Sequence, residues 1–207
     1  MTVTAIGGLT VTESGSTDDF TVVLDAEPAT NVVLTVTSAD PGEATVTPAT
    51  RTFTPVSCNV THTVTVTGVD DAILDGGQST TLTVAVDDAN SDDAYDPVPD
   101  ETLTVTTTDD DVAGFSVTET GGSTVVNETG TTDQITVVLD AEPAAGQVVE
   151  IDITSNDVGE VTVSPATLTF TPANWNVAQT VTVTGVDDAL VDGSQASNLA
   201  FAVDAAA

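Results

Sequence analysis

Pairs of aspartates close two nearly identical strand-like segments of this chain. The nine residues VTVTGVDDA occupy positions 64–72 and again positions 181–189. Calcium takes six to eight oxygen ligands, mostly carboxylates and carbonyls from loops, so acidic residues that follow strands suit it. The sequence therefore predicts a Ca²⁺ site built from acidic loops. In the first half of the chain the expected ligands are Glu13, Asp40, Asp70, Asp71, Asp75, Asp109, Asp110 and Asp111.

The second half of the chain repeats part of this acidic set. Its run of three closing aspartates has no counterpart, so we expect the second site to be incomplete. The candidate ligands there are Glu128, Asp157, Asp187, Asp188 and Asp192.

Carboxylates gathered at one end of a small domain would repel one another. Two like charges 4 Å apart interact by about 4 kcal/mol at an effective dielectric constant of 20. A bound cation would convert that penalty into binding energy. The alternative is that Asp-Asp and Asp-Gly pairs are ordinary turn formers and that the acids make a solvated, halophile-type coat. Five loop residues fit this alternative well: Asp92, Asp93, Asp96, Asp100 and Glu101.

The charge of the chain excludes several classes of function. There are 33 acidic residues against one lysine or arginine side chain, and the formal net charge is −32. Nucleic acid and anionic membranes would be repelled, so neither is an expected partner. The sequence contains no run of about 18 apolar residues, so we expect no segment that inserts into a membrane. With one histidine and one cysteine, a nucleophile has no base and zinc has too few ligands, so we expect no enzyme.

The duplicated stretch is the centre of a long internal repeat. The phrase TVVLDAEP begins at position 21 and again at position 136, an offset of 115 residues. After two inserted residues the offset becomes 117, and VDDAILDG at 69–76 matches VDDALVDG at 186–193. A period of this length suits an independent domain better than a solenoid repeat. We place the domains at residues 1–111 and 112–207.

Alternation of Val and Thr predicts that each domain is a β-sandwich. Such alternation puts valine on a buried face and threonine on a solvated one. In the first domain we expect antiparallel strands at 9–13, 19–25, 31–38, 44–47 with 50–54, 62–69, 80–86 and 102–108. Short strands at this spacing predict an all-β protein of two tandem Greek-key, immunoglobulin-like sandwiches. Phe53 and Phe170 match in the repeat and should be core, while Cys58 and Trp175 match and should each plug a sandwich near a loop.

The order of these motifs resembles the Calx-beta domain. The resemblance lies in the glutamate near the first strand, the VDD…DG loop and the closing TDDD, and it is most specific at residues 168–193. The chain is also similar to repeats of large bacterial surface proteins and adhesins, with phrases such as LTFTPANWN. This resemblance implies calcium-binding loops at one end of each sandwich and an extracellular or cell-surface location. It favours a non-catalytic structural module of an adhesin, matrix protein or filament. The alternative is a module that binds a glycan or protein ligand.

The second domain lacks the equivalent of its last strand. Leu199, Phe201 and Val203 align with Leu82, Val84 and Val86, so residues 91–111 of the first domain have no counterpart. An uncovered strand edge is a template for pairing with another strand. Either the sequence is a segment of a longer array of neighbouring repeats, or another chain, such as an identical subunit, adds a strand there.

Overall fold

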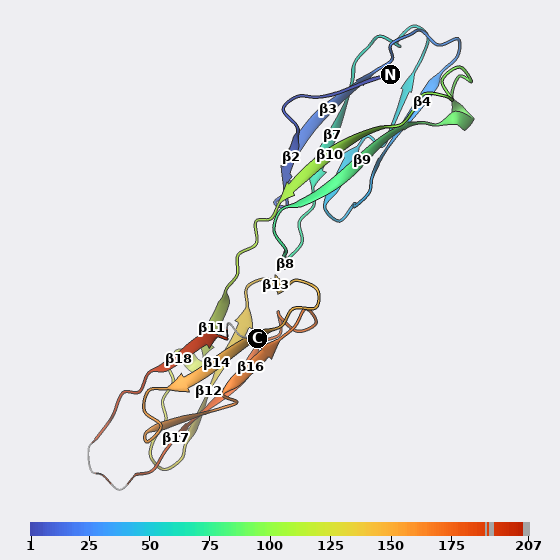
Figure 1. The fold of residues 1–207 in the computed structure, drawn as a ribbon. Coiled ribbons are helices and arrows are strands. Elements are labelled where there is room, and N and C mark those ends of the chain that lie inside the picture. The colour runs from blue at the N-terminus through green and yellow to red at the C-terminus, as the bar shows by residue number, and fades with distance from the viewer. Residues whose placement is uncertain (189, 191–192, 205–207) are drawn as a thin grey trace. The chain divides into compact units, whose positions relative to one another are not determined.

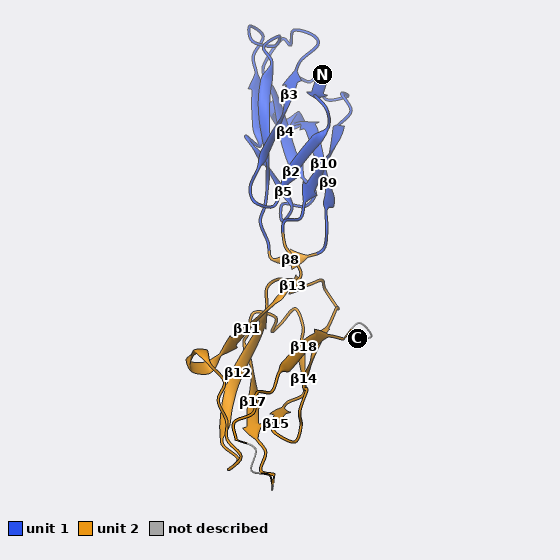
Figure 2. Ribbon diagram, turned by 90° about the vertical axis from the view of Figure 1, so that its left-hand side faces the viewer, with its two compact units in different colours: residues 1–71, 75–110 blue, residues 72–74, 111–207 orange. Residues whose placement is uncertain are grey.

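The regular secondary structure of the chain is almost entirely β-strand (Figure 1). The computed structural model describes residues 1–188, 190 and 193–204. It divides into unit 1, residues 1–71 and 75–110, and unit 2, residues 72–74 and 111–207 (Figure 2). Two single-turn 3₁₀ helices, η1 (Asp88–Asn90) and η2 (Thr120–Gly122), are also present. In the described ranges, no helix has the length and apolar character needed to cross a membrane.

Unit 1 consists of two sheets. In spatial order the first contains β1 (Thr2–Ala5), β3 (Thr17–Val23), β7 (His62–Gly68) and β5 (Ala44–Thr47). The second contains β2 (Leu9–Thr12), β10 (Glu101–Thr108), β9 (Gln78–Val86), β4 (Val32–Ser38) and β6 (Thr50–Phe53). Neighbouring strands are antiparallel except β2 and β10, which are parallel.

The predicted alternation of valine and threonine builds the core of unit 1. Val64 and Val66 of β7 are fully buried, and the threonines between and beside them are not. They share one apolar cluster with Leu34 of β4 and Val105 of β10, so side chains from both sheets meet in a single core. This arrangement confirms the prediction of an immunoglobulin-like β-sandwich.

The start of unit 1 contains one strand more than was predicted. The strand expected at 9–13 is present as β2, but β1 precedes it and lies in the other sheet. The chain changes sheet between them at Gly7 and Gly8, where φ is +87° at both residues and glycine is the residue that tolerates it. Because of this switch, β2 runs parallel to β10, and the expectation of purely antiparallel pairing was wrong.

Unit 2 repeats the first sheet of unit 1 but has a smaller second sheet. The first contains, in order, β11 (Phe115–Glu119), β12 (Thr132–Leu139), β17 (Gln179–Gly185) and β15 (Val161–Ser164). The second contains β16 (Thr167–Phe170), β14 (Val149–Ser155) and β18 (Leu199–Val203). A short parallel pair, β13 (Glu142–Pro143) with β8 (Ile73–Leu74), completes the unit. Within the described residues, no strand of unit 2 takes the place of β2 or β10.

Two pairs of residues that match in the repeat, Phe53 with Phe170 and Cys58 with Trp175, lie where the sequence predicts. Phe53 and Phe170 are fully buried in their respective cores. Cys58 and Trp175 are partly buried and pack against those cores. The indole N–H of Trp175 donates to the Glu142 carboxylate at 3.1 Å, which satisfies its polar atom.

Candidate metal centre

The parallel pairing of β2 and β10 brings acids from the two ends of unit 1 together. Thr12 lies opposite Thr108 at the ends of the two strands. The N–H of Glu13 then donates to the carbonyl of Thr108 at 3.1 Å, which fixes Glu13 beside the residue that precedes Asp109. Because parallel strands end at the same edge of a sheet, acids that follow each strand become neighbours.

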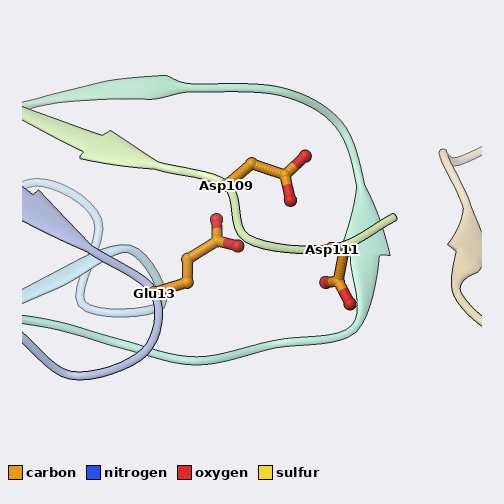
Figure 3. A group of neighbouring side chains, drawn as sticks. All are labelled: Glu13, Asp109 and Asp111. Atoms are coloured by element: carbon orange, nitrogen blue, oxygen red, sulfur yellow. The ribbon is translucent and has the colours of Figure 1, made fainter. Parts of the chain in front are cut away.

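Three carboxylates converge at this edge (Figure 3). One oxygen from each of Glu13, Asp109 and Asp111 lies within 4.8 Å of the other two. Two oxygens that each bind calcium at about 2.4 Å can be at most about 4.8 Å apart, so the separations in this group are compatible with a shared ion. The N–H of Gly76 donates to Asp109 at 2.7 Å and helps to hold that side chain in place.

Glu13 is the most buried acid of the group. Its side chain is 1% exposed, and its Oε2 atom has no hydrogen-bond partner. Burial, followed by the negative charges of Asp109, Asp71 and Glu43, raises its pKa to about 7, while the N–H of Asp110 donates to the carboxylate and opposes the rise. A buried carboxylate among other carboxylates is costly unless a cation offsets the charge.

Glu43 is a further member of the acidic region that the sequence analysis missed. Its Oε2 atom is buried and has no hydrogen-bond partner. Burial raises its pKa, and the charges of Asp75, Asp71, Asp40 and Asp109 raise it further. The repeat itself carries a signal for this residue, because Gly-Glu at 42–43 recurs as Gly-Glu at 159–160.

The other predicted ligands of unit 1 lie at different distances from this group. Asp71 and Asp75 are close enough for their charges to act on Glu43, and Asp71 also acts on Glu13. Asp40 accepts the N–H of Gly42 at 3.0 Å within its own turn. The side chains of Asp70 and Asp110 are exposed and lie outside the three-residue group.

Among the described residues of unit 2, the predicted ligands do not form a close group of three. Glu128, the counterpart of Glu13, is half-buried, and Asp187 is exposed. Asp157 accepts the N–H of Gly159 at 3.1 Å, and Asp188 accepts that of Leu190 at 2.8 Å, so both serve local turns. Asp192 lies outside the described residues. Where unit 2 is described, it holds no group of three acids close enough to share an ion.

Asp92 has a structural role, and its assignment to a solvated coat was wrong. Its Oδ2 accepts the N–H groups of Ala29 and Thr30 at 2.6 and 2.9 Å, and its Oδ1 accepts that of Ala94 at 3.0 Å. The Thr30 bond is the largest of the contacts that lower its pKa. Nearby, the buried Tyr95 donates its hydroxyl to the carbonyl of Ala26. Together these contacts fix the 88–98 loop to unit 1.

Comparisons with known proteins give weak structural likenesses. No protein-family model matches the sequence, and no curated protein matches it at a significant level. Calcium-binding domain CBD12 of CALX1.1 is similar at 16% identity and a TM-score of 0.38, over 91% of this chain and 77% of that one. The Escherichia coli chaperone DraB gives 11% identity and a TM-score of 0.39, over 91% of this chain and 86% of that one. SSP-19 of Caenorhabditis elegans, an MSP-domain-like protein, gives 19% identity and a TM-score of 0.33, over 49% of this chain and 92% of that one. All three TM-scores are below 0.5, so these likenesses carry no argument about function.

Proposed function

We propose that Glu13, Asp109 and Asp111, which gather at the edge where β2 and β10 end, bind calcium. The observation that carries this proposal is the Glu13 side chain. It is 1% exposed, has an oxygen without a hydrogen-bond partner, and lies among carboxylates of Asp109 and Asp111 within 4.8 Å. A divalent cation would give that oxygen a partner and offset the mutual repulsion of the group.

The ligand chemistry favours calcium over other cations. The three candidate ligands are all carboxylates, whereas zinc is usually held by cysteine and histidine. Magnesium demands near-ideal octahedral geometry and gives up its water reluctantly. Calcium accepts six to eight oxygens in flexible geometry, so Glu13, Asp109 and Asp111 would supply part of its shell. Glu43 is placed to supply a further carboxylate or to add charge nearby.

We further propose that the chain is a non-catalytic structural module of an extracellular protein, such as a surface adhesin, matrix protein or filament. The Calx-beta-like phrases of residues 168–193 and the net charge of −32 support this assignment. In unit 1, the ion would stabilise the folded state by joining acids that follow two different strands. A ligand that binds only the folded state stabilises it by mass action.

Thermal unfolding tests this function. At fixed ionic strength, millimolar calcium should raise the melting temperature of unit 1 by several degrees, since about 1 kcal/mol corresponds to about 4–8 °C in a domain of this size. Chelator should reverse the rise, and magnesium at the same concentration should give a smaller one. Equal melting temperatures in calcium and in chelator would overturn the proposal and favour a salt-screened acidic coat.

A further inference from the structure

Unit 2 contains a groove where unit 1 has a strand. A cavity of about 890 Å³ lies between residues 124–127 and β18. Its apolar lining includes Val126, Ile135, Val183, Leu199 and Phe201. The corresponding space in unit 1 is occupied by β10, which lies between β2 and β9 and buries Val105 completely.

One wall of the groove is held in the position that β2 has in unit 1. The N–H of Thr12 donates to Ser16 Oγ at 2.8 Å, and in unit 2 the N–H of Asn127 donates to Thr131 Oγ1 at 2.8 Å. Thr12 in unit 1 and Asn127 in unit 2 also each pack against a glycine in the first sheet of the same unit. An added Cβ at Gly68 would meet the Thr12 carbonyl oxygen at 2.1 Å, and one at Gly185 would meet that of Asn127 at 2.1 Å.

A second pair of equivalent hydrogen bonds, one in each unit, shows which backbone edge of this wall is free to pair with another strand. The N–H of Thr10 donates to Asp18 at 3.1 Å, and that of Val125 donates to Asp133 at 2.9 Å. Successive N–H groups of an extended segment point to opposite sides. Because the matched residues of unit 1 form the extended strand β2, we infer that the N–H groups of Thr124 and Val126 point away from Asp133, along the edge that β2 uses to pair with β10.

The opposite wall of the groove is an open strand edge. In unit 1, β9 pairs with β4 on one side and β10 on the other. In unit 2, the described pairing of β18 is with β14. The side chains show the same difference, because Leu82 and Val84 of β9 are fully buried whereas their counterparts Leu199 and Phe201 are half-buried. The hydroxyl of Thr124 is buried without a hydrogen-bond partner. Buried polar groups are usually hydrogen-bonded, so an added strand could supply the partner that this hydroxyl lacks.

We propose that this groove accepts one extended β-strand of the β10 type, supplied by polypeptide outside these 207 residues. The strand would lie parallel to residues 124–127 and antiparallel to β18, with inward positions equivalent to Leu103, Val105 and Thr107. A second copy of this chain is disfavoured as the donor, because its own β10 already pairs with β2 and β9. Addition of a strand to an open sheet edge combines main-chain hydrogen bonds with pockets for alternate side chains.

A peptide that spans residues 100–111 tests the proposal on the full chain. It should be labelled with a fluorophore and titrated without calcium in about 1 M NaCl, where the Debye length is about 3 Å and charge repulsion is screened. We expect one peptide per chain and slowed amide hydrogen exchange at Thr124, Val126 and β18. The matched control is the same peptide with Val105→Asp, which should bind at least about tenfold more weakly, because an inward apolar side chain is lost.

A second experiment uses a chain that is extended at its C-terminus by a copy of residues 91–111. The copied strand should fill the groove in cis, slow exchange at Thr124 and Val126, and abolish peptide binding. The proposal is overturned if the original chain, with unit 2 folded, binds no peptide at a peptide concentration of about 1 mM. A dissociation constant of that size corresponds to a binding free energy of only about 4 kcal/mol. It is also overturned if sedimentation shows a dimer of the chain alone with Thr124 and Val126 protected, since the donor would then be a second copy.

The peptide also carries the closing aspartates 109–111. When it is bound in register, these residues would lie beside Glu128 as Asp109 lies beside Glu13, so the complex should gain calcium affinity in unit 2. This consequence rests on the proposed function, whereas binding of the peptide without calcium does not. Peptide binding with no added calcium affinity would therefore show that the equivalent acids of unit 2 do not form a calcium site, and would leave the strand groove supported.

Discussion

A carboxylate oxygen of Glu13 lies within 4.8 Å of one of Asp109, although the two residues come from opposite ends of unit 1. The parallel pairing of β2 with β10 causes this approach, because each acid directly follows one of these strands. An ion bound at this point would hold together β2 and β10, the first and last strands of the larger sheet in chain order, at the edge where both end.

Removal of the buried charge should separate metal binding from folding. In Glu13→Gln we expect calcium affinity to fall at least about tenfold, because a charged ligand is lost. At pH 8 without metal, the variant should be more stable than the wild type, by up to about 3 kcal/mol, because its buried group carries no charge. Calorimetric titration and urea unfolding measure the two effects. The matched control is Glu128→Gln at the equivalent position of unit 2, which should change neither value appreciably; equal losses in both variants would refute the assignment to unit 1.

The stability of the metal-free protein should fall as pH rises from about 5 to 8. The folded pKa of Glu13 is about 7 against an ordinary value of 4.5, so between these values the folded state binds more protons than the unfolded state. The free energy of unfolding then decreases with pH, by up to about 3 kcal/mol across the window. The raised pKa of Glu43 acts in the same direction. Urea unfolding in chelator at pH 5 and pH 8 measures the change, and greater stability at pH 8 would contradict it.

Asp70 and Asp71 are adjacent in sequence but should differ in their effect on calcium. Both side chains are exposed, but the charge of Asp71 raises the pKa of both Glu13 and Glu43, whereas Asp70 is not among the charges that raise either pKa. We expect Asp71→Asn to weaken calcium binding by about tenfold and Asp70→Asn to have a much smaller effect. Each substitution keeps a turn-forming side chain, so the fold should be unchanged. A larger loss in Asp70→Asn would place the ion on the other side of this loop.

The 88–98 loop should depend on Asp92 through hydrogen bonds rather than through general charge. Asp92→Ala removes the acceptor of three backbone N–H groups and should lower the melting temperature. High salt should not restore it, because screening does not replace a hydrogen-bond acceptor. The control is Asp93→Ala, an exposed neighbour whose removal should be neutral or slightly stabilising through reduced repulsion. Equal behaviour of the two variants would return Asp92 to the solvated coat.

Much of the strand framework could be predicted from local pattern. The Val/Thr alternation at 44–47 and 62–69 predicted β5 and, to within one residue, β7, because burial on one face imposes a period of two. The division of residues 2–12 between two sheets could not be predicted this way. It depends on a backbone switch at two glycines, and the parallel pairing that results is a tertiary property.

The candidate metal centre shows the same limit. Glu13 and Asp109 could be selected because Glu13 ends one predicted strand and Asp109 directly follows another. Glu43 was missed because it lies in the turn before β5 rather than after a strand, and its proximity to Asp71 and Asp75 arises from packing between loops. Asp92 was misassigned because a carboxylate that caps backbone N–H groups from a distant turn has the same local sequence context as a solvated one.

A crystal structure of the full chain grown with calcium would show whether Glu13, Asp109 and Asp111 share one ion. We expect an ion bound to carboxylate oxygens of these three residues at about 2.3–2.6 Å, with anomalous scattering that identifies calcium. We also expect that the Glu13 oxygen without a hydrogen-bond partner becomes a ligand. Calcium bound elsewhere while Glu13 remains without metal contact, or no ion at millimolar calcium, would contradict the calcium proposal.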